Sequence, residues 1–342
     1  MDKVSESKPS VINLTALSKQ LQDRPDRRVV WPGIVEGTLN LVFGPPKSGK
    51  TTLCENLALC ICNGEKSFLD KPIGIEQSKV LFISFEEAIE LRGKRLQQIS
   101  SRYLNAHEHF EVNSIDFMRS VVDENDLEQL KNTIKSSEAK VVIIDSLNYL
   151  YGDGKIEASR DSRKLASRLR SIPQECEVTL IVIHHTTKRP SDMVLEMKDM
   201  AGSRVLHQEI DGALGVNMTS NQTRYLKLFP GRYYPNDEDQ VLVFGIGRNH
   251  QIEKVGWENE HELLKDSSSA QTPRMHTQVL KAIKEILEET DKTYTTTNEV
   301  LAMVDVPPSS LYRYLQKLER EGEIARAHNQ ILLPNKAKNM RK

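Results

Sequence analysis

The chain has 342 residues, a formal net charge of -1 and 28% charged residues. This length exceeds one small domain and suits one large α/β domain with an accessory part. A chain this close to neutral carries no basic field over its whole surface, so any contact with nucleic acid must come from a local patch. No apolar run approaches the roughly 18 residues of a membrane span, and MDKVSESKPS does not fit a signal peptide, which predicts a cytoplasmic protein with no membrane partner.

Residues 1–28 are polar apart from a short apolar-periodic stretch at Val11–Leu21, which predicts an N-terminal arm or a lone helix. From residue 29 onward, apolar runs alternate with amphipathic stretches, the pattern of an α/β domain with a mainly parallel sheet flanked by helices. We expect four strands at Leu39–Phe43, Val80–Phe85, Val141–Asp145 and Thr179–His184. Further strands, as antiparallel additions, are expected at Gly212–Met218, Arg224–Phe229 and Val241–Ile246.

The stretch KDSSSAQTP, Lys265–Pro273, is rich in serine and indicates a linker between two domains. A compact helical segment follows it and ends in ILLP. The chain is therefore predicted to divide into an arm at 1–28, a large α/β domain at 29–264, the linker at 265–273, a small domain at 274–334 and a basic tail at 335–342.

The sequence GPPKSGKT fits the pattern G-x-x-x-x-G-K-[ST] between an expected strand and an expected helix. Glycines let successive backbone N–H groups curl around phosphates, and the helix N-terminus adds positive potential there. Lys50 is expected to bridge the β- and γ-phosphates, and Thr51 to offer its hydroxyl to Mg²⁺. The predicted nucleotide-binding residues are Gly44, Pro45, Pro46, Lys47, Ser48, Gly49, Lys50, Thr51 and Thr52.

Acidic residues end two other expected strands. In KVVIIDSL four apolar β-formers end at Asp145, where an acid that organises Mg²⁺ is expected, although a cap of the following turn is an alternative. The next residue is Ser146, so no adjacent Asp-Glu pair is present. Glu86, at the end of VLFISFEEA, is the candidate base that orients and deprotonates the attacking water. The alternative for Glu86 is a solvated acid at a helix start.

A fourth expected strand, TLIVIHHTTK, ends in His184 and His185. Adjacent residues on a strand point to opposite faces, so the two imidazoles are poorly placed to hold one metal ion together. One histidine is expected to face the nucleotide and the other the interior or solvent. We take His185 as the candidate sensor of the γ-phosphate.

In this order, GPPKSGKTTL, VLFISFEE, VVIIDSL and TLIVIHHTTK resemble the core of RecA-like ATPases over about residues 29–250. Within that class they look most like the RepA group of plasmid replicative helicases and its AAA_25-type relatives, with DnaB-type helicases and KaiC more distant. The resemblance implies hydrolysis of ATP with Mg²⁺ by Lys50, Glu86, Asp145 and His185. It also implies a homo-oligomer, a hexameric ring or a related filament, with ATP between subunits.

The resemblance further implies an arginine or lysine finger from a neighbouring subunit, because charge develops on the γ-phosphate without enough local compensation. The stretch RYLKLFPGRYYP offers Lys227 and Arg232, similar to the Lys-x-Arg hairpin of DnaB-type helicases but with longer spacing. Arg232 is equally open to interpretation as a turn residue after Pro230-Gly231. Arg204 is a competing candidate, and its stretch MAGSRVLHQEID resembles the segment that faces the pore and contacts DNA in ring helicases.

Beyond the linker, TQVLKAIKEILEET, TTNEVLAMVDV and PPSSLYRYLQKLEREGEI predict three helices, and ARAHNQILL predicts a short hairpin. The pattern resembles a winged helix-turn-helix with Pro307–Glu321 as recognition helix, whose polar face suits phosphate and base-edge contacts. The candidate DNA-binding residues are Ser309, Tyr312, Arg313, Lys317 and Arg320, together with Arg204. From Arg274 to Lys342 there are 12 Lys and Arg against 9 Asp and Glu, a mild excess that keeps protein contacts or ring assembly as the alternative use.

These patterns together predict an ATP-hydrolysing motor that acts on DNA. The leading hypothesis is a ring-forming helicase or translocase of a plasmid, phage or mobile element, with single-stranded DNA in the ring and duplex DNA at the winged helix. A DNA-binding regulatory or loader ATPase that does not unwind DNA is one alternative. A KaiC-like signalling ATPase whose winged helix binds protein is the other.

Overall fold

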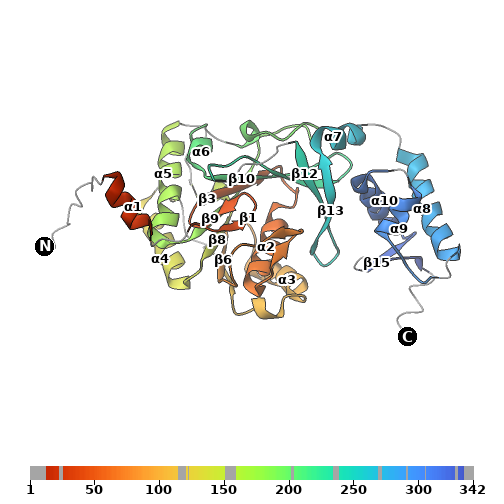
Figure 1. Ribbon diagram of the computed structural model, residues 1–342, viewed down its shortest axis with the longest axis horizontal. Coiled ribbons are helices and arrows are strands. Elements are labelled where there is room, and N and C mark those ends of the chain that lie inside the picture. The colour runs from red at the N-terminus through yellow and green to blue at the C-terminus, as the bar shows by residue number, and fades with distance from the viewer. Residues whose placement is uncertain are drawn as a thin grey trace.

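The computed structural model describes residues 13–22, 26–114, 121, 123–150, 159–201, 204–233, 239–268, 272–289, 292–304, 306–327 and 330–334. A nine-stranded sheet forms the centre of the molecule, with the strand order β13-β12-β11-β10-β3-β9-β8-β6-β7 (Figure 1). The six strands from β10 to β7 are parallel, and β11, β12 and β13 continue the sheet in antiparallel fashion. In chain order these strands are β3 (Leu39–Gly44), β6 (Val80–Ser84), β7 (Phe110–Ser114), β8 (Val141–Asp145), β9 (Thr179–His185), β10 (Gly212–Met218), β11 (Arg224–Leu228), β12 (Gln240–Ile246) and β13 (Ile252–Asn259).

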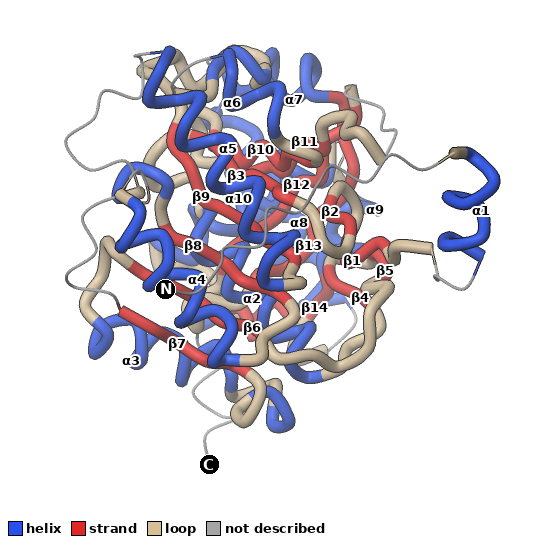
Figure 2. Tube along the Cα trace, turned by 90° about the vertical axis from the view of Figure 1, so that its left-hand side faces the viewer, coloured by secondary structure: helices blue, strands red, loops and turns tan. Residues whose placement is uncertain are grey.

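Helices cover both faces of this sheet, which is why its central strands β3 and β8 are buried at every position and mostly apolar (Figure 2). Along β3, Val42 packs into the cluster on the face of α2 (Lys50–Asn63). Its neighbours Leu41 and Phe43 pack on the opposite face, against α4 (Glu124–Ser137) and α5 (Ser159–Cys176). This alternation follows the two-residue period of a strand.

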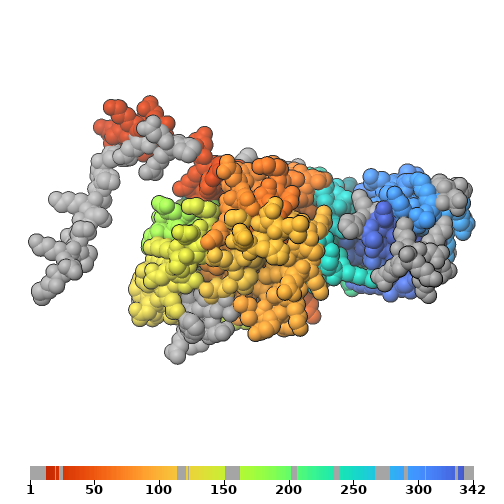
Figure 3. Space-filling model, turned by 90° about the horizontal axis from the view of Figure 1, so that it is seen from below, coloured from red at the N-terminus to blue at the C-terminus, as the bar shows by residue number. Residues whose placement is uncertain are grey.

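Shorter elements complete this part of the chain, which we call the ATPase core, β1 to α7. They are β1 (Val29–Trp31), β2 (Ile34–Val35), β4 (Ser67–Phe68), β5 (Lys71–Pro72), α3 (Ile89–Ser100), α6 (Arg204–Glu209), α7 (Glu260–Ser268) and the 3-10 turns Leu104–Ala106, Leu147–Tyr149 and Met197–Asp199. Helix α1 (Leu14–Gln22) precedes the core and stands away from it (Figure 3). No helix among the described residues has the length and apolarity needed to cross a bilayer.

Beyond α7 the chain forms a second unit with an apolar core of its own. We call this unit, α8 to β16, the C-terminal module. Its elements are α8 (Thr272–Glu289), β14 (Thr295–Thr296), α9 (Thr297–Met303), α10 (Pro308–Arg320), β15 (Ala325–Ala327) and β16 (Gln330–Leu332). Apolar residues of its helices, among them Val279, Ile283, Leu311 and Leu315, are fully buried in that core. The module abuts the outer strands β12 and β13 (Figures 1 and 3).

The predicted α/β architecture is confirmed, and each of the seven predicted strands is present within one residue of its expected bounds. Strands β7 and β13 were not predicted. The stretch proposed as a linker is largely helical, because Lys265–Ser268 extends α7 and α8 already begins at Thr272, while residues 269–271 lie outside the described residues. Residues 11–12 of the predicted N-terminal patch and the basic tail 335–342 also lie outside them.

Candidate active site

The phosphate loop joins the carboxyl end of β3 to the start of α2. Gly44 has no room for a side chain, since a Cβ there would lie 1.9 Å from the carbonyl oxygen of Val216. Gly49 caps α2 with φ 103°, a left-handed conformation that side chains disfavour. The ammonium of Lys50 donates to the carbonyls of Gly44 at 3.0 Å and Pro45 at 2.8 Å, so the loop curls around its own lysine.

Burial lowers the pKa of Lys50 to about 8. A phosphate group placed in the loop opposes that shift, because an adjacent negative charge favours the ammonium form. The hydroxyl of Ser48 is buried and has no hydrogen-bond partner in the described part of the chain. The cavity at this loop is lined by Pro46, Lys47 and Gly49 to Thr52 among the predicted residues, whereas Gly44 and Pro45 hold Lys50 from behind.

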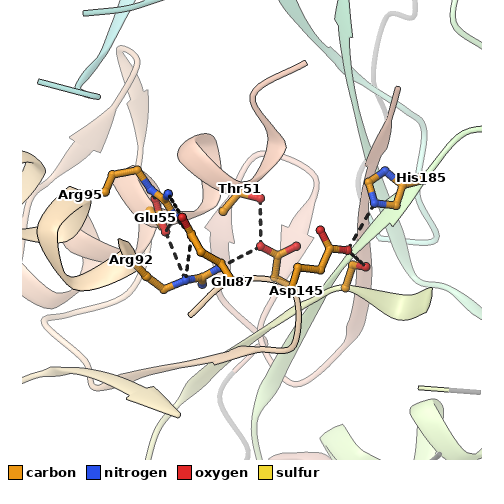
Figure 4. A network of polar contacts seen from close by, with 9 residues as sticks. Thr51, Glu55, Glu87, Arg92, Arg95, Asp145 and His185 are labelled. Carbon is orange, nitrogen blue, oxygen red and sulfur yellow. Dashed lines mark hydrogen bonds and ion pairs between the residues drawn. The ribbon is translucent and has the colours of Figure 1, made fainter. Parts of the chain in front are cut away.

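Thr51 and Asp145 form the candidate magnesium site. The Thr51 hydroxyl donates to Oδ2 of Asp145 over 2.9 Å, from the first turn of α2 to the carboxyl end of β8 (Figure 4). A hydroxyl and a carboxylate are oxygen ligands of the kind Mg²⁺ accepts, and this ion takes few protein ligands when substrate phosphates supply others. The pair therefore fits a nucleotide-bound Mg²⁺, whose charge would neutralise the phosphates there. Burial raises the pKa of Asp145, and a cation in the site would oppose that rise.

Glu86 faces the same cavity from the loop after β6. The hydroxyl of Ser146 donates to its Oε1, and Nε2 of His185 lies 3.5 Å from the same oxygen. The contact with His185, assisted by Ser146, lowers the pKa of Glu86 and keeps the carboxylate ionised near neutral pH. An ionised, half-exposed carboxylate at this position can accept a proton from a water molecule.

The two histidines at the end of β9 point to opposite sides of the sheet. His185 lines the cavity, while Nε2 of the fully buried His184 lies 2.6 Å from the carbonyl oxygen of Ala201. Burial lowers the pKa of His184 to about 4, so this imidazole is neutral at physiological pH. Its ring therefore donates through Nε2 to the Ala201 carbonyl.

A buried network of charges stands directly behind Asp145, and the sequence patterns above did not indicate it. The guanidinium of Arg92, 1% exposed, lies 3.1 Å from Oδ2 of Asp145, 3.6 Å from Glu87 and 3.9 Å from Glu55 (Figure 4). Arg95, one turn further along α3, joins Glu55 and Glu87 through bidentate contacts. The signal that was available is the i, i+3 spacing of two arginines on a helix that begins just after Glu86-Glu87.

The candidate fingers occupy different environments. Lys227 is buried, with its ammonium 2.6 Å from Glu260 and 3.0 Å from the Leu195 carbonyl, so it cannot reach a neighbouring subunit, and we withdraw it as a finger. Arg232 is exposed. Its guanidinium donates a hydrogen bond of 2.7 Å to the carbonyl oxygen of Gln208 and lies 3.8 Å from the carboxylate of Asp211. Arg204 begins α6, and its side chain lies outside the described residues.

The candidate DNA-binding residues on α10 do not share one free face. Ser309 and Tyr312 are buried against the ATPase core, which contradicts their expected exposure to DNA. Arg313 lies over the ring of Tyr314 at 4.7 Å and donates to its hydroxyl. Lys317 is exposed beside Glu321, and Arg320 lines the nucleotide cavity.

The cavity that unites these groups has a volume of about 630 Å³, within the range of small-molecule sites. Five lysine and arginine residues line it against the two acids Glu86 and Asp145, a balance that suits a triphosphate. One part is formed by the loop with Glu86, Asp145 and His185. The other part is formed by residues of β11, β12 and α10, including Arg224, Ile246 and Arg320.

A phosphate loop at the carboxyl edge of a mixed sheet, with an acid ending β8 and a second acid following β6, defines a RecA-like P-loop ATPase. The AAA_25 family, described as an AAA domain, matches residues 6–191, more than half of the chain. The chain belongs to this family.

Two relatives are named DNA repair protein RadA. The protein of Chlamydia pneumoniae is 26% identical over 222 residues, which cover 63% of this chain and 41% of the relative. That of Brucella abortus is 25% identical over 264 residues, 73% of this chain and 50% of the relative. The chain thus spans half or less of the length of these relatives. A crystal structure of the RadB recombinase is similar at 22% identity with a TM-score of 0.47, covering 66% of this chain and 93% of that one.

Proposed function

We propose that this ATPase couples hydrolysis of ATP to action on DNA. The observation that carries the ATPase part is the convergence of Lys50, Glu86, Asp145 and His185 on one cavity of about 630 Å³. The names of the RadA relatives support the DNA part. The finer form of the proposal is a homo-oligomeric motor, a hexameric ring or filament, that moves on single-stranded DNA.

In this proposal the hydrolysis step follows from the residues around the cavity. Glu86 accepts a proton from a water molecule whose oxygen attacks the γ-phosphorus, and the bond from that phosphorus to the bridging oxygen breaks as ADP leaves with the electron pair. Lys50 neutralises charge on the β- and γ-phosphates. His185 holds the Glu86 carboxylate toward the cavity, and Mg²⁺ held at Thr51 and Asp145 would supply further positive charge.

The oligomer supplies the remaining charge compensation through Arg232 of a neighbouring subunit, the exposed one of the two fingers predicted around β11. Its guanidinium is 45% exposed and lies in a surface loop after β11, which suits contact with a second copy. Mixing inactive Lys50→Ala subunits with Arg232→Ala subunits tests this arrangement. ATPase activity should appear only in the mixture, because a Lys50→Ala subunit supplies Arg232 to an intact phosphate loop on its partner. If the mixture stays inactive, the two subunits do not share the site.

A regulatory or loader ATPase is the second candidate, and the position of α10 favours it. The winged-helix assignment of the C-terminal module is a proposal, and the face expected to meet DNA holds the buried Ser309 and Tyr312. An ATPase whose module opens only in one nucleotide state would switch DNA binding without unwinding.

One experiment separates the candidates. ATP hydrolysis and strand displacement are measured with no DNA, single-stranded DNA and duplex DNA, with Lys50→Ala as the inactive control. A motor requires hydrolysis stimulated by single strands together with displacement. Stimulation without displacement supports the regulatory form, and hydrolysis indifferent to both DNAs contradicts action on DNA while leaving the ATPase assignment intact.

A further inference from the structure

Helix α10 of the C-terminal module is fitted closely onto the outer strands of the ATPase sheet. The ring of Tyr312 occupies the space beside Gly245 on β12, where a Cβ would lie 1.6 Å from the tyrosine hydroxyl oxygen. On β13 a Cβ at Gly256 would meet Pro308 at 3.6 Å. Gly245 thus leaves room on the sheet for the Tyr312 ring, whereas a methyl at Gly256 would make only an ordinary contact with Pro308. A packed contact of this kind needs complementary surfaces on both units.

A carboxylate of the sheet caps this helix. Glu258 of β13 accepts the backbone N–H of Ser309 at 2.7 Å and the Ser309 hydroxyl through its second oxygen. The helix has no side-chain cap from its own N-cap residue, Pro307. A negative charge at a helix N-terminus satisfies free N–H groups and opposes the helix dipole. The N-terminus of α10 is therefore completed by the ATPase core.

The other end of α10 reaches the nucleotide cavity. Arg320 donates to Oε1 of Gln222 over 2.7 Å, across the two units, and lines the cavity together with Gln316. Next to it, Glu319 pairs with Arg248 of the core at 3.7 Å and with Arg326 of its own module at 3.1 Å. The same helix that is capped by β13 therefore ends beside the phosphate loop.

Arg320 contacts Gln222 just before β11. Strands β11 and β12 lie on the opposite side of β3 from β9, β8 and β6, whose carboxyl ends carry or precede His185, Asp145 and Glu86. A Cβ at Gly49 would lie 3.0 Å from Ile246 and 3.5 Å from Arg224, which places β11 and β12 against the loop where α2 starts. If the γ-phosphate binds beside Glu86, the α-phosphate and nucleoside of ATP would extend toward Arg224, Ile246 and Arg320. Nε of Arg224 is buried and has no hydrogen-bond partner in the described part of the chain, as expected of a donor that awaits a ligand.

We propose that the C-terminal module is a lid on the ATP site of its own chain, and that Arg320 of α10 binds the nucleotide at its α-phosphate and ribose. The module then contributes to nucleotide recognition with the helix face that sequence patterns assign to DNA. This inference rests on the ATPase assignment and not on any action on DNA. The inference about Arg320 and the proposal about DNA can therefore be refuted independently.

The first test measures ADP binding by calorimetry in the full-length chain, in the absence of DNA. Arg320→Ala should weaken ADP binding about tenfold or more, the effect of losing a hydrogen bond to a charged group. The control is Lys281→Ala on α8, an exposed cation of the same module that pairs with Glu285 and lies outside the cavity. It should bind ADP as the unmodified chain does.

Tripolyphosphate, which lacks the nucleoside, identifies the part of the ligand that Arg320 contacts. Tripolyphosphate keeps a counterpart of the α-phosphate but has no ribose, so its binding, measured by competition, should be weakened less by Arg320→Ala than the binding of ADP is. ADP binding unaffected by Arg320→Ala overturns the proposal. An equal weakening for ADP and tripolyphosphate also overturns it, because Arg320 would then act through general charge alone.

The second test moves the lid without touching the cavity. Gly245→Ala places a methyl group where the Tyr312 ring lies, so it should displace α10 and weaken ADP binding as much as Arg320→Ala. Adding Tyr312→Ala removes the clash and should restore affinity. If the double variant binds ADP no better than Gly245→Ala, the loss comes from damage to β12 and not from displacement of the lid, and the proposal fails.

Discussion

Arg92 is the residue whose replacement tests the buried charge network most directly. Its guanidinium is 1% exposed and lies among Glu55, Glu87 and Asp145, with Arg95 as the second cation. Arg92→Met fills similar space but leaves three acids against one cation. Removing one partner of a buried ion pair costs about 3–5 kcal/mol in the free energy of unfolding, and we expect a loss of that size.

The loss should depend on pH in a defined direction. Burial already raises the pKa of Asp145 above 3.8, and Arg92 is the strongest influence that lowers it. Without Arg92 the folded-state pKa rises further, so folding favours the protonated carboxyl. The destabilisation should therefore be greatest above that pKa and should shrink as the pH falls toward 3.8.

Urea unfolding followed by tryptophan fluorescence measures this free energy in the relevant unit. The chain has two tryptophans, Trp31 in β1 and Trp257 in β13, so the signal reports the ATPase core and not the C-terminal module. Arg92→Lys keeps the charge without the guanidinium fork and should lose less than Arg92→Met. A loss below about 1 kcal/mol for Arg92→Met, or a loss that does not shrink in acid, would refute the reasoning.

Three further outcomes are expected. Glu86→Gln should lower kcat by about 10²–10⁴ in a steady-state ATPase assay while ADP affinity is kept, as expected for loss of a general base; a normal rate would exclude that role. Lys227→Met should lower the free energy of unfolding in urea by about 3–5 kcal/mol, because it leaves the buried Glu260 carboxylate without its cation. The ATPase rate per folded molecule should not change. A lower ATPase rate without a loss of stability would make Lys227 a candidate finger again. The pKa of His184 is lowered to about 4, so between about pH 6.5 and 4 the folded state binds fewer protons than the unfolded state. The free energy of unfolding should therefore fall as the pH drops from about 6.5 toward 4. Thermal unfolding across that range should show a smaller fall for His184→Gln.

The ATP site was largely predictable because its parts are local or lie at strand ends. The phosphate loop is one continuous stretch, and Glu86, Asp145 and His185 each follow an apolar run. Parallel strands bring their carboxyl ends to one edge of the sheet, so side chains separated by as many as 99 residues meet there. The spacing of apolar residues, and the polar residues that end each apolar run, are therefore sufficient to predict that these side chains lie together.

The network around Arg92 was not predictable by the same means. Its partner Asp145 lies 53 residues away, and the pattern of α3 does not distinguish a buried arginine from an exposed one. Charged residues are assigned to the surface by default, and only the packing of α3 against α2 and β8 reverses that assignment.

The position of α10 was missed for a related reason. The spacing of Leu311 and Leu315 reveals the side that packs inside its own module, and polarity marks the remaining face as exposed. Ser309 and Tyr312 are nevertheless buried, because Glu258 and Gly245, on strands earlier in the chain, lie against them. Contacts between two separately packed units leave no periodic signal in either sequence.

The place of β3 in the sheet has a consequence for how the protein is made. This strand carries the phosphate loop, yet its neighbours on either side are β9 and β10, which begin at Thr179 and Gly212. A ribosome adds roughly 5–20 residues per second, so on the order of ten seconds separates synthesis of the loop from that of its flanking strands. During that interval the apolar residues of β3 have no partner strands on either side. The centre of the fold, and with it the nucleotide site, is completed only when well over half of the chain exists.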